Sequence, residues 1–277
     1  MSPGSGASGR FTVDDLGRPV PLGPGARRIV SLAPSCTEGL LAIGAGDRLV
    51  GVEEHSAMPE LAGIPRVGGF KHVDVDRIVA LAPDLVVAAS LHARATAPRL
   101  EAKGIPVFVT QPRTLDAVIN GMARLAAVAG IAAAAAPYLE RCRERLRAVL
   151  DRTLRARQRP LVYLELSTAG HTGGPQSFLD DLVTKAGGVN LGGVARVEWP
   201  VIPPSVVRGF DPDLIVIARS PSSATRASVL ARPGWEGLAA VQAGRVWEVP
   251  FGIVKRPGPG LLDGVERLAE IVREARP

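Results

Sequence analysis

Several side chains in this 277-residue sequence are of types that bind ligands, and they lie in segments typical of loops. In the run Gly68-Gly-Phe-Lys-His72 the paired glycines let the backbone approach a flat ligand, and Phe70 can pack on its face. His171 lies at the centre of a second run, 167–176, rich in Gly, Thr and Ser. An imidazole can ligate a metal ion, and Arg256 can meet a propionate or phosphate through two parallel hydrogen bonds. These residue types predict non-covalent capture of a ligand.

Further candidates stand next to apolar runs of strand length. Ser35 and Thr37 follow the first run, where both can cap a helix and face a ligand. Trp199 precedes a proline, and Phe251 follows the last run. The predicted ligand-contacting residues are Ser35, Thr37, Gly69, Phe70, Lys71, His72, His171, Trp199, Phe251 and Arg256.

An enzyme is the less favoured interpretation. The sequence has no Gly-x-Ser-x-Gly elbow, phosphate-binding loop or His-Glu-x-x-His pair, and we predict no catalytic residue. A chelatase-like enzyme needs a His and a carboxylate converging on a macrocycle. His72 with Asp74, or His171 with Asp180, would fill those roles, and Cys36 at a helix start would have a lowered pKa.

The apolar runs predict the elements that position these residues. They are continuous rather than alternating, which is typical of parallel strands covered on both faces. With helical patterns between several of them, they indicate an α/β fold. The runs are 29–32, 49–52, 85–89, 107–109, 161–166, 214–218 and 246–249.

An internal repeat predicts two similar lobes. Residues 76–87 align without a gap on residues 205–216, so that an offset of 129 relates Pro83 to Pro212 and Asp84 to Asp213. In both copies a short helix should end before the proline, and Pro-Asp should turn the chain into a buried strand. Because strand-end loops of such lobes carry ligands, we expect a shared cleft.

One long helix is predicted between the repeats, over residues 132–157, which contain no glycine. Apolar residues at spacings of three and four form one stripe, and the arginines at 141, 143, 145 and 147 should form a solvated face. Its 26 residues would make a rod of roughly 39 Å. We therefore predict two Rossmann-like lobes joined by this helix: a tail and hairpin (1–26), a first lobe (27–131), the helix (132–157) and a second lobe (158–277).

Composition limits the partners. The net charge of +6 is spread along the chain without a basic-aromatic surface motif, so we expect no nucleic-acid partner. No apolar run reaches 18 residues, so we expect no membrane insertion, and we expect a monomer. Cys36 and Cys142 have no zinc-site spacing and should be small buried hydrophobes. The first ten residues lack the plan of a secretory signal, and no cysteine there could carry a lipid.

Several segments, in order along nearly the whole chain, resemble the metal-chelate substrate-binding proteins of ABC importers, which carry cobalamin, haem and ferric siderophores. The segments are Arg28–Gly51, the hairpin Thr12–Val20, Val67-Gly-Gly-Phe70, Ile78–Val86 and Arg256-Pro-Gly-Pro-Gly260. The resemblance implies two α/β lobes joined by a single helix, an ABC permease as partner, and a location outside the cytoplasm. Because no export signal stands in the sequence, it was either removed or the protein stays in the cytoplasm. In the latter case it would sequester a corrinoid or haem.

The resemblance also bears on the ligand. In cobalamin-binding members an aromatic residue follows the Gly-Gly segment and a Trp precedes Pro in the second lobe, which matches Phe70 and Trp199. Haem-binding members often place an iron-ligating Tyr where Phe70 stands. Because Phe cannot ligate iron, haem is a less favoured ligand. His72 could instead offer an imidazole to cobalt or iron. We expect cobalamin or another corrinoid, with haem or a ferric siderophore as alternatives.

In the resembled importers each lobe presents one carboxylate to the permease. Asp76 matches the first-lobe position, and the repeat places Ser205 at the second. An exposed ion pair contributes only about 0–1 kcal/mol, so one loss need not abolish docking. The hypothesis is that coupling to a standard permease is weakened or absent.

Overall fold

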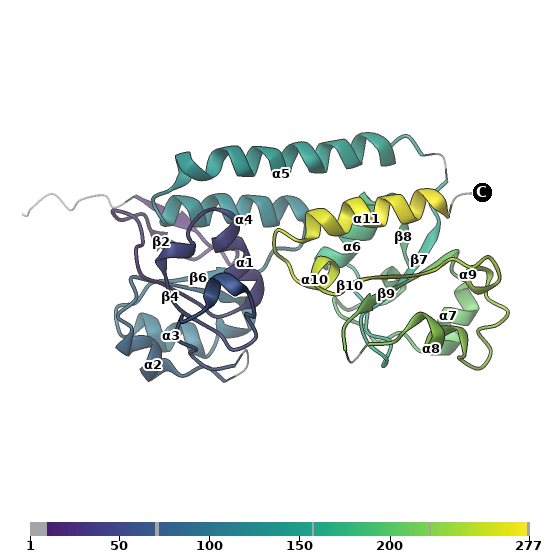
Figure 1. Cartoon of the computed structure of the whole chain (residues 1–277), viewed down its shortest axis with the longest axis horizontal. Helices are drawn as coiled ribbons and strands as arrows, with labels where there is room; N and C mark the ends of the chain where they lie inside the picture. The colour runs from purple at the N-terminus through teal and green to yellow at the C-terminus, as the bar shows by residue number, and fades with distance from the viewer. Residues whose placement is uncertain (1–9, 70–71, 157, 222, 276–277) are drawn as a thin grey trace, which may run out of the picture. The chain divides into compact units, whose positions relative to one another are not determined.

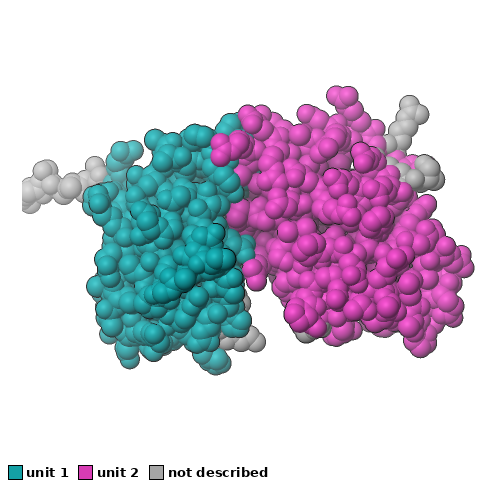
Figure 2. Space-filling model, viewed as in Figure 1, with its two compact units in different colours: residues 1–111, 119–140 teal, residues 112–118, 141–277 magenta. Residues whose placement is uncertain are grey.

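The computed structural model describes residues 10–69, 72–156, 158–221 and 223–275. The chain divides into two compact units (Figure 2). Each unit has its own parallel sheet. Unit 1 comprises residues 1–111 and 119–140, and unit 2 comprises residues 112–118 and 141–277. This is the α/β architecture with two Rossmann-like sheets that the apolar runs predicted.

Unit 1 begins with an antiparallel hairpin of β1 (Phe11–Val13) and β2 (Pro19–Pro21). Its parallel sheet has the order β4-β3-β5-β6, from strands β3 (Ile29–Ser31), β4 (Leu49–Val52), β5 (Leu85–Ala89) and β6 (Val107–Thr110). The helices are α1 (Pro34–Ala42), α2 (Val75–Ala80), α3 (Thr96–Glu101) and most of α4 (Leu115–Val128). Apolar side chains on one face of β3, β5 and β6 pack with those of α2 and α3. Ile29, Val87 and Phe108, which alternate with them along the strands, are also fully buried, so both faces are covered.

Unit 2 repeats this topology. Its parallel sheet has the order β10-β9-β7-β8, from β7 (Leu161–Glu165), β8 (Val189–Asn190), β9 (Leu214–Arg219) and β10 (Val246–Pro250). The helices are α6 (Phe178–Lys185), α7 (Pro204–Phe210), α8 (Arg226–Leu230), α9 (Ala239–Gln242), α10 (Gly252–Lys255) and α11 (Leu261–Glu274). Helices α6, α10 and α11 pack on one another (Figure 1). Trp235 is fully buried in this core, and its ring makes a T-shaped contact with that of Tyr163.

The internal repeat corresponds to equivalent elements in the two units. Helices α2 and α7 begin 129 residues apart, as do strands β5 and β9. Ala82 and Asp211, which precede the two prolines, both have positive φ, 46° and 44°. The repeated aspartates cap neighbouring strands: the Asp84 carboxylate accepts the backbone N–H groups of Arg27 and Arg28, and Asp213 accepts that of Leu161. The prediction of two similar lobes is therefore confirmed in detail.

The long helix, α5 (Ala132–Thr153), is shorter than predicted. Its 22 residues span roughly 33 Å, and it ends four residues early, since Leu154 is 79 % exposed and the apolar stripe stops there. Cys142, Leu146 and Val149 are buried, as the stripe predicted. The arginine face is not simply solvated, because Arg145 binds both carboxylate oxygens of Glu266 on α11 at 2.8 and 2.7 Å. The division between the units falls within α5, between residues 140 and 141.

Candidate ligand-binding site

Both sheets share a topology that favours ligands at one edge. In unit 1 the chain passes from β3 to β4 on one side and then to β5 on the other, and β7, β8 and β9 do the same in unit 2. Ligands of doubly wound sheets bind where the strand order reverses, outside the carboxyl ends of the strands. The segments that follow the strands are therefore the candidate site in each unit.

A buried polar cluster supports the strand ends of unit 1. The Glu53 side chain, just after β4, is fully buried and accepts the Ser56 hydroxyl at 2.6 Å and the His55 backbone N–H at 2.6 Å. The His55 ring contacts the same carboxylate, with Nδ1 3.1 Å from Oε2, while 66 % of its side chain remains exposed. The buried Glu53 carboxylate thus holds the turn of residues 53–56, and the His55 imidazole extends into solvent.

The Gly68–His72 loop is closed by backbone hydrogen bonds. Gly68 has φ +99° and pairs with Val73, and the His72 N–H donates to the Gly69 carbonyl at 3.2 Å. A Cβ on Gly68 would lie 2.4 Å from the His72 carbonyl oxygen, so the turn requires glycine. A Cβ on Gly69 would lie 3.8 Å from Cε1 of His55, which brings this loop beside the β4 turn. His72 is exposed, and the predicted contacts Phe70 and Lys71 lie outside the described residues.

In unit 2 two predicted loops join into one surface. Residue His171 pairs with Val201, Thr172 N–H donates to the Pro200 carbonyl, and Gly174 N–H donates to the Glu198 carbonyl. The exposed His171 ring has Nδ1 2.8 Å from the Ser167 hydroxyl. Trp199 is 43 % exposed, with its ring centroid 5.2 Å from that of Phe178. The structure therefore brings His171 and the Trp199 segment together.

The segment after β10 carries the last candidates. The Phe251 N–H donates to the Arg219 carbonyl, and the Lys255 ammonium lies 4.5 Å from the centroid of the Phe251 ring. Phe251 and Arg256 are both partly exposed. Partial burial lowers the pKa of Lys255.

Two predictions around α1 were wrong. Helix α1 starts from Ala33 with Pro34 in its first turn, so neither Ser35 nor Thr37 is its cap. Thr37 does not face a ligand: it is fully buried, and its hydroxyl donates within the cluster to Ser31 Oγ at 2.8 Å or the Ala33 carbonyl at 3.2 Å. Ser35 is partly exposed and remains a candidate.

The thiols and His92 are also enclosed. Cys36 and Cys142 are both buried, as predicted. Burial raises the pKa of Cys36 to about 11, which contradicts the lowered value of the enzyme alternative. His92 is buried with Nε2 3.2 Å from the Leu32 carbonyl oxygen, and burial lowers its pKa. Among the described residues no three His, Cys, Asp or Glu side chains gather where they could hold a metal ion.

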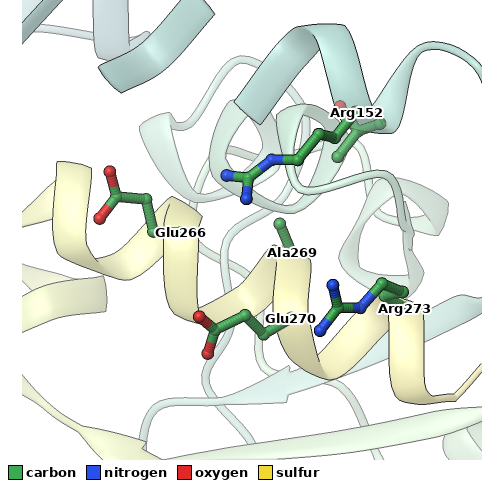
Figure 3. A pocket seen from close by; sticks show the side chains of 6 residues that line it. Arg152, Glu266, Ala269, Glu270 and Arg273 are labelled. Carbon is green, nitrogen blue, oxygen red and sulfur yellow. The ribbon is translucent and has the colours of Figure 1, made fainter. Parts of the chain in front are cut away.

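One hollow in unit 2 is too small for a macrocycle. It has a volume of about 40 Å³ and lies between α5 and α11, lined mostly by charged side chains and by Ala269 (Figure 3). Arg152 and Arg273 are drawn on either side of Ala269, and Glu270 lies next to Arg273 (Figure 3). Such a volume holds about one water molecule. This hollow is therefore not a site for a macrocycle.

Comparison with known proteins identifies the family. A model of the family described as periplasmic binding protein matches residues 29–251. The chain belongs to this family. The vitamin B12-binding protein of Yersinia pestis (strain Pestoides F) is 31 % identical over 216 residues, covering 75 % of each chain.

Solved structures agree with the fold. The periplasmic vitamin B12-binding protein BtuF of Vibrio cholerae is 26 % identical, with a TM-score of 0.76, over 90 % of this chain and 98 % of that one. The periplasmic haem-binding protein RhuT from Roseiflexus sp. RS-1 has a TM-score of 0.78 at 24 % identity, over 91 % of this chain and 99 % of that one. At 24 % identity, the similarity to RhuT shows a shared fold only.

The family consists of transport binding proteins, so this periplasmic binding protein of the metal-chelate import type is not an enzyme, and the chelatase interpretation is set aside. Within the described part of the chain, no helix is both long and apolar enough to cross a membrane.

Proposed function

We propose that this periplasmic binding protein captures cobalamin or a related corrinoid outside the cytoplasm and delivers it to an ABC importer. The observation that carries the proposal is the 31 % identity, over 216 residues, to a protein named vitamin B12-binding. Each unit by itself has a feature suited to a large flat ligand: Trp199 in unit 2 supplies apolar contact, and the glycine turn at Gly68 in unit 1 allows a close backbone approach.

Trp199 is the proposed aromatic contact in unit 2, next to His171. A buried Trp side chain covers about 150–250 Å². The 43 % that remains exposed could therefore bury about 65–110 Å² more against a ligand, which at about 25 cal/mol per Å² is roughly 2–3 kcal/mol. Removing the ring should weaken binding by roughly 10- to 100-fold.

The test is a visible-absorbance titration with cyanocobalamin, cobinamide and haemin side by side. The proposal expects one-to-one corrinoid binding that weakens in Trp199→Ala. Trp247→Ala is the matched control, because Trp247 lies within β10, where Arg267 stacks on its ring. Equal effects of the two substitutions would refute the role of Trp199. Binding of haemin without either corrinoid would replace cobalamin by haem as the cargo.

For delivery, we propose that Asp76 is the docking carboxylate of unit 1 and that unit 2 lacks its counterpart. Asp76 is exposed in the first turn of α2, and Ser205 is exposed at the equivalent position of α7. Coupling to a permease with an arginine pocket for each lobe should therefore be weak. Ser205→Glu should strengthen binding to such a permease, and Asp76→Ala should weaken it. Wild-type transport rates in an importer lacking its own binding protein would contradict weak coupling.

A further inference from the structure

His55 stands out among the four histidines by what fixes its ring. Its Nδ1 atom lies 3.1 Å from Oε2 of Glu53, a side chain with no solvent exposure. The same oxygen accepts the backbone N–H of His55 at 2.6 Å, and the other carboxylate oxygen accepts the Ser56 hydroxyl at 2.6 Å. Arg66 donates to the carbonyl oxygens of Glu53 and Ser56, which holds the turn itself.

This contact determines which ring nitrogen is free to bind. A carboxylate only accepts hydrogen bonds, so Nδ1 carries the proton and Nε2 keeps its lone pair. Histidines that ligate metals almost always donate their other ring N–H to a carboxylate, a backbone carbonyl or water, which fixes the ring and raises its basicity. Two of the other described histidines differ: His92 is buried, and the hydroxyl of Ser167 beside His171 can accept or donate, so it does not select a tautomer.

The position of His55 is suitable for a residue that coordinates the metal of a bound chelate. It follows β4 at the carboxyl edge of the sheet, and its Cε1 lies beside Gly69 in the glycine turn. A flat chelate resting on that turn would have its metal within reach of this imidazole. The nearby Glu54 carboxylate also faces Gly69, which favours a cationic metal centre over an anionic one.

We propose that Nε2 of His55 is an axial ligand to the metal of the captured chelate, with Glu53 as the residue that positions it; this rests on the proposed function. The step is a ligand exchange without redox change: the metal–water bond breaks, water leaves, and the Nε2 lone pair forms the new bond. The preferred cargo is therefore a chelate with an exchangeable axial position, such as aquacobalamin, aquacobinamide or haemin. A ferric centre already filled by a hexadentate siderophore offers no such position.

The experiment is a visible-absorbance titration of the full chain with aquacobalamin, haemin and cyanocobalamin. Wild type should shift the absorption bands of the first two, and His55→Ala should lose that shift while cyanocobalamin, whose axial cyanide blocks exchange, binds the two proteins within about twofold. His72→Ala distinguishes the two candidate imidazoles, because His72 was the metal ligand expected from the sequence: loss of the shift in His55→Ala alone supports His55, and loss in His72→Ala assigns the ligand to His72. Millimolar imidazole should restore the shift in His55→Ala.

A second measurement tests Glu53 without any ligand. Nitrogen-15 NMR of the histidine side chains in the apo protein should show His55 with its proton on Nδ1. Glu53→Gln should reduce that preference, and Glu54→Gln, on an exposed neighbour, should not. An unchanged band shift in His55→Ala, loss of the shift in His72→Ala, or a proton on Nε2 of His55 would overturn the inference and leave corrinoid capture standing. If none of the three chelates binds, both proposals fail.

Discussion

Removing Arg232 should destabilise unit 2 far more than removing a surface arginine. Glu165, in β7, is 1 % exposed, and both of its oxygens accept hydrogen bonds from Arg232 at 2.6 and 2.7 Å. Arg232 also stacks on the Trp235 ring at 4.6 Å. Arg232→Met keeps an apolar stem but leaves a buried carboxylate uncompensated, which costs about 3–5 kcal/mol.

The matched control is Arg267→Met. Its partner Glu270 lies 2.9 Å away, but the two side chains are 40 % and 51 % exposed, so the pair contributes about 0–1 kcal/mol. The double variant Arg232→Met/Glu165→Gln removes both charges and should recover most of the loss.

Urea unfolding followed by tryptophan fluorescence is the assay, because all three tryptophans (Trp199, Trp235 and Trp247) belong to unit 2. The signal therefore reports that unit. A loss in Arg232→Met no larger than that in Arg267→Met would refute the argument that the buried charge needs its partner. Failure of the double variant to recover would assign the effect to lost packing on Trp235.

Three further predictions follow from local environments. Because burial raises the pKa of Cys36 to about 11, Ellman's reagent at pH 8 should modify it only on unfolding, and rapid modification of the folded protein would contradict its enclosure. Gly68→Ala should weaken ligand binding and stability more than Gly63→Ala, measured by titration and thermal melting. Both glycines have positive φ, but a Cβ at Gly63 meets nothing within 4 Å; equal effects would refute the close contact at Gly68. Burial lowers the pKa of His92 from 6.5, so the unfolded state binds more protons, and the free energy of unfolding should fall as pH drops below about 6.5. His92→Gln should flatten that fall in urea titrations, and an unchanged pH profile would contradict it.

The sequence predicted the framework because the signals were long or repeated. Continuous apolar runs located seven parallel strands to within one or two residues. The 129-residue offset correctly predicted that α7 and β9 are the equivalents of α2 and β5. Strand β8 was missed because it has only two residues, too few for any periodicity. The predicted helix extended beyond the observed end of α5, because Leu154 continues the apolar spacing although its side chain is exposed.

The candidate site was harder to predict, because loop side chains depend on contacts that spacing does not reveal. Thr37 looks like a helix cap, yet its hydroxyl hydrogen-bonds to Ser31 or Ala33 and accepts the hydroxyl of Ser56, which lies after β4. The contact of Glu53 with His55 was missed, because Glu-Glu-His after a strand reads as a solvated turn until the burial of Glu53 is known. His171 and Trp199 were predicted separately, and the backbone pairing of residues 170–174 with 198–202 is what joins them.

Isothermal titration calorimetry of the wild-type protein with cyanocobalamin, and with cobinamide as second corrinoid, tests the central proposal most directly. Corrinoid capture predicts a saturable, one-to-one heat signal with both. No measurable binding of either corrinoid, by protein whose folding is confirmed by circular dichroism, would contradict it.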